Sequence, residues 1–257
     1  MRRLIPYIVF AIAATLSGAA AAAERPLTIA AAANLKDVMQ ALVADFRRTR
    51  ADAKVDVVLG SSGKFTQQIA HGAPYDLFFS ADLEYPQRLV TEQLTASGVR
   101  TYARGRLVLW SATRDARRLT LKDLADPAIR RIAIANPKLA PYGARARQAL
   151  EHAGIWDKVR DKLVFGQNVS QTAQFADSGG ADVAMIPLSL ALSPVLRQRG
   201  THVVIPESQS TPLDQGFVIL KRATGNPLAA AFADYVVSAP ARAIFAAHGY
   251  LAPASAP

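Results

Sequence analysis

Apolar and polar positions along this chain follow two alternating periods. Short apolar runs, for example at residues 27–30 and 55–59, have the composition of buried strands. Between such runs, apolar residues recur at spacings of three and four, as in an amphipathic helix, most clearly at Leu35, Val38, Met39, Leu42, Val43 and Phe46. The repeated order of strand and helix predicts an α/β fold with mostly parallel sheets flanked by helices.

The same pattern gives bounds for the individual elements. Strands are predicted at residues 27–30, 55–59, 76–79, 107–111, 132–135, 163–165, 183–186, 203–205 and 217–220. Closing helices are predicted at 227–237 and 240–247, since each opens on a proline suited to the first helical position. Asn34 is the expected N-cap of the first helix, because its side-chain oxygen can accept a bond from a first-turn N–H group.

Three of the predicted strands end in small polar residues just before a helix. The junctions are Ala33-Asn34, Gly60-Ser61-Ser62-Gly63 and Ser80-Ala81-Asp82. A helix N-terminus carries unpaired backbone N–H groups and the positive end of the helix dipole. Several such ends at one edge of a parallel sheet form an anion-binding site, so the sequence predicts a site for a small oxyanion.

The first 23 residues have the layout of a secretory signal peptide. Arg2 and Arg3 precede an apolar stretch at residues 4–16, and small residues follow up to Ala23. The apolar stretch is shorter than the ~20 residues that span a bilayer. We expect a protein that is exported to the periplasm and cleaved near Ala23.

Composition excludes several other classes. The chain has no cysteine, which excludes disulfides and thiolate metal sites, and its four histidines are scattered. The net charge of +10 comes from dispersed Lys and Arg residues, and aromatic residues make up only 7% of the chain, so no nucleic-acid partner is expected. A hydrophobic fraction of 51% excludes disorder.

No linker rich in Pro, Gly or Ser divides the chain, which favours a two-lobed protein whose chain crosses between the lobes twice. The polar stretches at 102–105 and 209–215 are the expected crossings. The predicted domains are the signal peptide at 1–23, a first lobe at 24–103 plus 215–257, and a second lobe at 104–214.

Three motifs resemble a known family. They are Ala31-Ala32-Ala33-Asn34-Leu35, Gly60-Ser61-Ser62-Gly63 and, most specifically, the run from Gly72 to Asp82, GAPYDLFFSAD. These motifs resemble the periplasmic molybdate-binding proteins of ABC transporters, the ModA family. The similarity continues through Ile134-Ala135-Asn136-Pro137 and Tyr142-Gly143 into the C-terminal helices, and so covers nearly the whole mature chain.

This resemblance implies a type II periplasmic-binding-protein fold with a ligand cleft between two lobes. It implies that one molybdate or tungstate oxyanion is held through its oxygens by hydroxyl and backbone N–H groups, without direct metal ligation and without a cofactor. It further implies a membrane permease as partner, no enzymatic activity and, we expect, a monomer.

The resemblance also assigns site residues. Asn34 stands where the family usually places a serine, and Ser62 matches a hydroxyl donor. Backbone N–H groups are expected from Ala81 and, in the second lobe, from Val169. Many members place a donor tyrosine where this chain has Pro187, and a subset takes it from the segment that matches Tyr142. We therefore predict that Tyr142 supplies the hydroxyl that a proline lacks, with Gly143 leaving room for close approach.

Other ligands and another class of protein stay open from sequence. The same fold can hold sulfate, phosphate or an organic anion. Phosphate is disfavoured because it carries a proton at neutral pH and needs an acceptor, whereas molybdate, tungstate and sulfate suit a cage of donors. A secreted phosphate- or sulfate-ester hydrolase would use Ser62 as nucleophile, but no nearby histidine or G-x-S-x-G elbow supports it.

Nearby polar residues are expected to have structural roles. Ser61 is expected to be a structural hydroxyl, and Lys64 a solvated charge. Asp76 and Asp82 bracket a strand and suggest a carboxylate pair, but an anion site would avoid both. Capping and strand-end hydrogen bonds are the predicted roles of the two aspartates.

Overall fold

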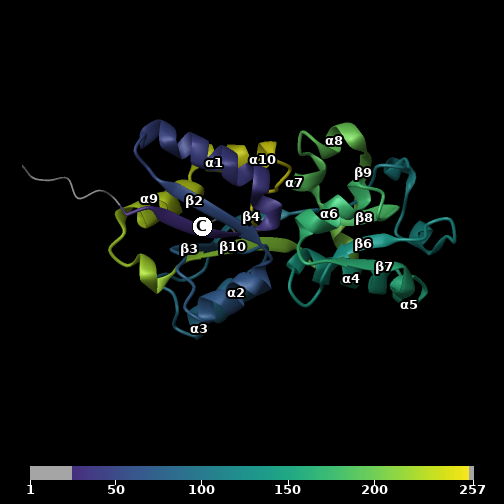
Figure 1. Cartoon of the computed structure of the whole chain (residues 1–257), viewed down its shortest axis with the longest axis horizontal. Helices are drawn as coiled ribbons and strands as arrows, with labels where there is room; N and C mark the ends of the chain where they lie inside the picture. Colours follow the sequence, from purple (N-terminus) through teal and green to yellow (C-terminus); the bar gives the residue numbers. More distant parts are fainter. Residues whose placement is uncertain (1–24, 255–257) are drawn as a thin grey trace, which may run out of the picture.

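The computed structural model describes residues 25–254, so the predicted signal peptide at 1–23 lies outside the described residues. The described chain forms two halves side by side, each built on a five-stranded sheet with helices on both faces (Figure 1). The two-lobed α/β fold predicted from sequence is confirmed.

The first sheet has the strand order β2-β1-β3-β10-β4. Its strands are β1 (Leu27–Ala32), β2 (Val55–Gly60), β3 (Leu77–Phe79), β4 (Arg100–Gly105) and β10 (Leu213–Ile219). β1 is parallel to both β2 and β3, whereas β10 is antiparallel to both β3 and β4. The carboxyl ends of β1, β2 and β3 therefore meet at one edge of the sheet.

The second sheet repeats this arrangement with the order β7-β6-β8-β5-β9. Its strands are β5 (Leu107–Ser111), β6 (Ile132–Ala135), β7 (Leu163–Gly166), β8 (Val183–Pro187) and β9 (Thr201–Val204). β6 is parallel to β7 and β8, and β5 is antiparallel to β8 and β9. Both sheets are thus mixed rather than mostly parallel, because β10 in the first sheet and β5 in the second run opposite to the other four strands.

Helices cover both faces of each sheet. Those of the first half are α1 (Lys36–Thr49), α2 (Ser62–Ala70), α3 (Glu84–Thr91), α9 (Pro227–Val236) and α10 (Ala239–Ala247). Those of the second half are α4 (Pro141–His152), α5 (Trp156–Val159), α6 (Val169–Asp177), α7 (Leu188–Ala191) and α8 (Leu196–Arg199). Short 3-10 turns lie at Ala33–Leu35, Ala116–Arg118, Lys122–Ala125, Arg160–Lys162, Glu207–Gln209 and Lys221–Ala223.

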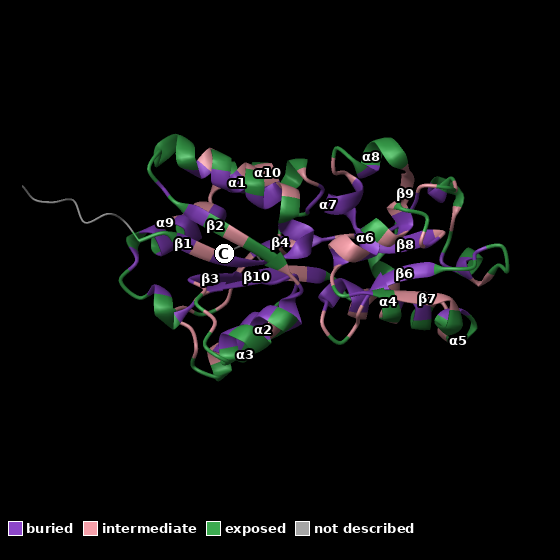
Figure 2. Cartoon of the chain, in the orientation of Figure 1, coloured by how far each residue is buried: buried purple, intermediate pink, exposed green. Residues whose placement is uncertain are grey.

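The buried sides of the helices face the sheets, and their outer sides are exposed (Figure 2). In α1 the buried residues are Val38, Met39, Leu42, Val43 and Phe46, the face predicted from spacing. Together with α9 and α10 they pack on one face of the first sheet, while α2 and α3 cover the other. No single helix within residues 25–254 has the length and apolarity to cross a membrane; only the pair α9 and α10, bent by 61°, passes by length and composition.

The start of the first helix differs from the prediction. Asn34 is not an N-cap but the middle residue of the 3-10 turn Ala33–Leu35, and α1 begins after Leu35 without a side-chain cap. The physical reason is that the hydrogen bonds from the Asn34 amide nitrogen to Gln215 and Tyr250 hold the side chain away from the first turn of α1. Asn34 is therefore turned into the protein rather than toward the first turn of its own helix.

The chain passes from the first sheet to the second between Gly105 and Leu107, and returns between Val204 and Leu213. The strand β4 was not predicted, because Arg100, Thr101 and Arg104 break the apolar run. The lobe boundaries at residues 103/104 and 214/215 stay a prediction.

Candidate functional site

A small cavity lies between the two halves. It is lined by Ala32, Ala33, Asn34, Gly60, Ser61, Ser62 and Ala81 of the first half and by Ala140, Pro141, Tyr142, Asn168 and Val169 of the second. Its volume is about 10 Å³, which leaves space for about one water molecule. The walls from the two halves therefore nearly meet. The structure thus brings all five predicted site residues to one cavity.

The start of α2 contributes Ser62 to this wall. Ser62 is 1% exposed, and its Oγ accepts a hydrogen bond from the Ala81 N–H group at 3.1 Å. The hydroxyl proton of Ser62 is not used in this bond and is available to a ligand. The Ala81 N–H group, expected to donate into the site, donates to Ser62 in this structure.

Ser61 has a larger place in the site than expected. It is the N-cap residue of α2 by position, yet its side chain makes no capping bond. The residue is 4% exposed, and its Oγ has no hydrogen-bond partner although it is buried. The two adjacent serines in the sequence are the only signal that could have suggested a second hydroxyl on the wall.

The start of α6 contributes Val169 from the second half. Asn168 caps this helix, since its Oδ1 accepts a bond from the Gln171 N–H at 3.0 Å. The Val169 N–H group is the first of the helix and has no carbonyl of a preceding turn to bond with. The positive end of the α6 dipole therefore meets the cavity.

Tyr142 lies in the first turn of α4, which opens on Pro141. The residue is 2% exposed, and its hydroxyl oxygen accepts a bond from Gln215 Nε2 at 3.0 Å. Burial raises the pKa of Tyr142 well above its usual value of 10, so the hydroxyl stays protonated at neutral pH. A Cβ at Gly143 would lie 2.1 Å from the Ala135 carbonyl oxygen, so this glycine permits close packing of α4 on β6 rather than approach of a ligand.

Asn34 belongs to a buried polar network behind the cavity. Its Nδ2 donates to Gln215 Oε1 and to the Tyr250 hydroxyl, each at 2.9 Å. Its backbone carbonyl accepts from the hydroxyls of Tyr250 at 2.8 Å and Ser189 at 2.9 Å. Its Oδ1 is buried without a partner. Sequence reasoning missed Gln215, Tyr250 and Ser189, because nothing local distinguishes them from other polar residues near strands and helix ends.

Hydrogen bonds join the two halves around the cavity. The Gly63 N–H donates to the Leu139 carbonyl at 2.9 Å, and the Tyr85 hydroxyl donates to the Lys138 carbonyl at 3.2 Å. A Cβ at Gly63 would lie 2.6 Å from the Tyr85 hydroxyl oxygen and 3.0 Å from the Leu139 carbonyl oxygen, so glycine allows this contact. The structure is closed over the site.

Comparisons with known proteins agree with this geometry. Residues 27–251 match the model of the bacterial extracellular solute-binding protein family. The chain is 36% identical to the molybdate-binding protein ModA of Azotobacter vinelandii over 93% of this chain and 94% of the relative. It is 33% identical to ModA of Rhodobacter capsulatus over 94% of each. The solved periplasmic molybdate-binding protein of Azotobacter vinelandii matches with a TM-score of 0.83 at 34% identity, over 88% of this chain and 99% of that one.

The chain belongs to the ModA family of bacterial extracellular solute-binding proteins. The family consists of binding proteins rather than enzymes, as expected for this chain from its sequence. Pro187, where the sequence lacks the usual tyrosine, ends β8 and precedes α7, and it is not among the residues that line the cavity.

The side chains that line the cavity carry no charge. No Lys or Arg is among the residues that line it. Within residues 25–254, no group of three or more His, Cys, Asp or Glu side chains is placed to hold a metal ion. The described site therefore offers hydrogen bonds rather than metal ligands or counter-charges.

The nearby aspartates hold local structure. Asp82 Oδ1 accepts from Ser80 Oγ at 2.8 Å and from the Tyr85 N–H at 3.2 Å, near the start of α3. Burial raises the pKa of Asp82 from 3.8 to about 6, against the opposing effect of these two bonds. Asp76 Oδ2 accepts from the Thr28 N–H at 2.9 Å, so it fixes the first sheet at the end far from the site.

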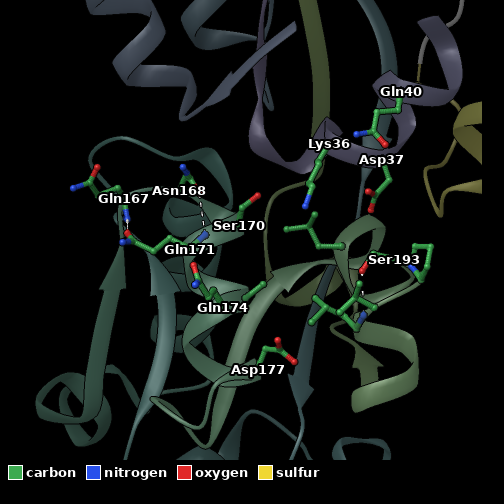
Figure 3. A pocket seen from close by; sticks show the side chains of 15 residues that line it. Lys36, Asp37, Gln40, Gln167, Asn168, Ser170, Gln171, Gln174, Asp177 and Ser193 are labelled. Atoms are coloured by element: carbon green, nitrogen blue, oxygen red, sulfur yellow. Dashed lines mark hydrogen bonds between the residues drawn. The ribbon is translucent and has the colours of Figure 1, made fainter. Parts of the chain in front are cut away.

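A larger groove of about 810 Å³ adjoins the cavity through Asn168, which lines both. Figure 3 shows Lys36, Asp37 and Gln40 from α1 on one side of the groove and Gln171 and Gln174 from α6 on the other. Its polar groups are spread over an open surface. The small cavity, whose polar groups are enclosed, is the better candidate for a small anion.

Proposed function

We propose that this protein binds molybdate in the cavity between its two halves and delivers it to the membrane permease of an ABC transporter. The observation that carries the proposal is the composition of the wall, where hydroxyls and helix-start N–H groups meet without a Lys or Arg. Such a wall suits a small dianion that is fully ionised at neutral pH and requires only donors. The names of the two ModA relatives support molybdate as that dianion.

In this proposal Asn34, Ser62, Ala81, Tyr142 and Val169 surround the oxyanion. Ser62, Tyr142 and the Val169 N–H group donate to its oxygens, while Ala81 acts through Ser62 and Asn34 through Gln215. Tungstate is accepted as well, because the site contacts only the oxygen shell. The protein acts as a monomer in the periplasm after cleavage near Ala23. The two lobes, at 24–103 plus 215–257 and at 104–214, close over the ligand.

Ser62 and Tyr142 make the proposal specific to this chain. Ser62 comes from the first half and Tyr142 from the second, and each has a hydroxyl proton free of the hydrogen bond that its oxygen accepts. A ligand that takes both protons joins the halves. The binding energy of the anion is then also the energy that favours closure.

Calorimetric titration with molybdate, tungstate, sulfate and phosphate tests the proposal. We expect heat and a 1:1 endpoint with molybdate and tungstate, and no comparable binding of phosphate. Tyr235→Phe serves as a matched hydroxyl control, because Tyr235 bonds Asp45 Oδ2 at 2.9 Å and does not line the cavity. Absence of molybdate binding, or equal binding of phosphate, would overturn the proposal.

A further inference from the structure

We infer that Gln215 is a positioning residue that decides which group of the oxyanion site, the Tyr142 hydroxyl or the Asn34 amide, presents its hydrogen atoms to the ligand. The inference rests on the proposed function, since it concerns the same cavity. Gln215 itself does not line the cavity and acts through its two neighbours.

Gln215 lies at the centre of the polar network. It is fully buried in β10, where the pairing with β4 shifts register between Gln215 and Gly216. Its Nε2 donates to the Tyr142 hydroxyl oxygen at 3.0 Å. Its Oε1 accepts from Asn34 Nδ2 at 2.9 Å and lies 2.8 Å from the Tyr102 hydroxyl. One side-chain amide thus connects the two residues on opposite walls of the site.

This arrangement fixes the direction of the Tyr142 hydroxyl. A tyrosine hydroxyl has one proton, and Gln215 Nε2 cannot accept it, because an amide nitrogen only donates hydrogen bonds. Because Gln215 donates to the Tyr142 oxygen, the Tyr142 proton points elsewhere and is free for a ligand oxygen. In this arrangement Asn34 cannot donate to the ligand, because its Nδ2 already bonds to Gln215. Its Oδ1 is buried without a hydrogen-bond partner.

The opposite arrangement requires two amides to turn together. A half-turn of the Asn34 amide would present Nδ2 to the ligand, but it would place Oδ1 against Gln215 Oε1, two acceptors in contact. If Gln215 also turned, its Nε2 would donate to Asn34 and its Oε1 would take the Tyr142 proton. The Tyr142 hydroxyl and the Asn34 amide are therefore alternative donors, and Gln215 couples them.

Two further contacts favour the arrangement found. Tyr250 accepts from Asn34 Nδ2 and donates to the Asn34 carbonyl, so its hydroxyl is satisfied in both directions. Gly105 packs against the pair: a Cβ there would lie 2.0 Å from the Tyr142 hydroxyl oxygen and 2.3 Å from Gln215 Nε2. Tyr142 and Gln215 are thus enclosed at the crossing between the halves, which leaves Gln215 no room to move aside.

Gln215→Glu tests the inference, because an ionised carboxylate only accepts hydrogen bonds. Glutamate at this position would take the Tyr142 proton away from the ligand. We expect molybdate to bind about 10- to 100-fold more weakly, the effect of losing one hydrogen bond to a charged group. Gln215→Met, which cannot take the proton, should weaken binding less than Gln215→Glu although it removes every hydrogen bond of the side chain.

A double-mutant cycle separates positioning from simple charge repulsion. If Gln215 acts through the tyrosine proton, Gln215→Glu costs several-fold less affinity in a Tyr142→Phe background than in the parent. Repulsion between the new charge and the anion would persist in both backgrounds. Tyr235→Phe is the control partner, and its cycle with Gln215→Glu should be additive.

The outcomes are distinct. If the Gln215→Glu protein fails to fold, Gln215→Met and its double-mutant cycle with Tyr142→Phe replace it. In that case, a loss of molybdate affinity in Gln215→Met that equals or exceeds the loss in Tyr142→Phe overturns the inference. The inference is also overturned if Gln215→Glu weakens molybdate binding by the same factor in the parent protein and in the Tyr142→Phe variant. If the parent protein itself does not bind molybdate, the proposed function fails rather than the role of Gln215.

Discussion

The Ser62 hydroxyl oxygen accepts a hydrogen bond from the Ala81 N–H group, 3.1 Å away, and this bond joins the starts of two strand-to-helix segments. Ser62 begins α2, whereas Ala81 follows β3. The bond occupies the oxygen of the serine and leaves its proton free. It also shows that a backbone donor near an anion site can act through a side chain rather than on the ligand.

We predict that Ser62→Ala weakens molybdate binding by about 10- to 100-fold, since a hydrogen bond to a charged ligand is lost. The loss should lie at the lower end of this range, because the Ala81 N–H group becomes free to donate to the ligand in its place. Calorimetric titration measures the change. Asp82→Asn is the control, because Asp82 is buried next to Ala81 but does not line the cavity, and it should weaken binding much less. A larger loss of affinity in Asp82→Asn than in Ser62→Ala would place the site elsewhere.

We predict that Tyr142→Phe weakens binding by a similar factor while retaining the ring. Gln215 Nε2 loses its acceptor in this variant, so the free energy of unfolding without ligand should fall by about 1–2 kcal/mol. Titration and urea unfolding measure the two effects. Undiminished affinity would mean that the Tyr142 ring only packs, and that the chain has no tyrosine donor in this position.

We predict that molybdate raises the melting temperature and that phosphate does not. A ligand that binds only the folded protein adds about 2.7 kcal/mol of stability at a hundredfold excess over its dissociation constant. Phosphate carries a proton at neutral pH and would need an acceptor within a wall that consists mainly of donors. Thermal unfolding with each anion at equal concentration measures the difference, and equal shifts would contradict a cage of donors.

We predict that Asp82 makes the folded protein less stable as pH rises from about 4 to about 6, the interval between its unfolded pKa of 3.8 and its raised folded pKa. In this interval the folded state binds more protons than the unfolded state, so the free energy of unfolding falls with increasing pH. Asp82→Asn removes the effect and keeps an acceptor for Ser80 and Tyr85. Relative to the parent, the variant should gain about 1–3 kcal/mol between pH 4 and pH 7 by urea unfolding; a difference that does not change with pH would contradict the prediction.

We predict that Gly105→Ala destabilises the protein and weakens molybdate binding together. The added Cβ would overlap the Tyr142 hydroxyl oxygen at 2.0 Å, so the tyrosine must shift out of the site. Overpacking of this kind typically costs ~1–3 kcal/mol. Gly98→Ala is the matched control, because a Cβ at Gly98 would have no atom within 4 Å. Unfolding and titration of both variants measure the contrast, and equal behaviour would show that the crossing is plastic.

Much of this fold could be predicted from the sequence because its signals are local. The apolar spacing that follows Asn34 gave the buried face of α1, and the prolines at 227 and 240 marked α9 and α10. The small polar junctions after β1, β2 and β3 gave the edge of the first sheet that lines the cavity. The apolar runs did not reveal β4, because it carries Arg100 and Arg104. They gave strands at 107–111 and 217–220 but not their antiparallel direction, because pairings such as that of β4 with β10 join residues far apart in the chain.

The site was predictable only in part. The resemblance to the ModA family assigned Ser62, Tyr142 and Val169 to the site, and in the structure all three line one cavity. The orientation of each group depends on long-range partners that a sequence pattern does not contain. Gln215 lies 181 positions from Asn34 and 73 from Tyr142, and only the folded chain shows that it bonds to both.

The pairing of Gly105 with Leu213 at the end of the first sheet has a mechanical consequence. Both passages between the halves meet the first sheet at this pair, and at the second sheet the Ile205 N–H donates to the Leu107 carbonyl at 2.9 Å, so the two passages are joined at both ends. Two passages that are joined in this way restrict how the halves can move apart. The bonds from Gly63 to Leu139, from Ser189 to Asn34 and from Gln215 to Tyr142 must then break in the same movement. Release of a ligand from the cavity therefore requires that these bonds between the halves are lost as well.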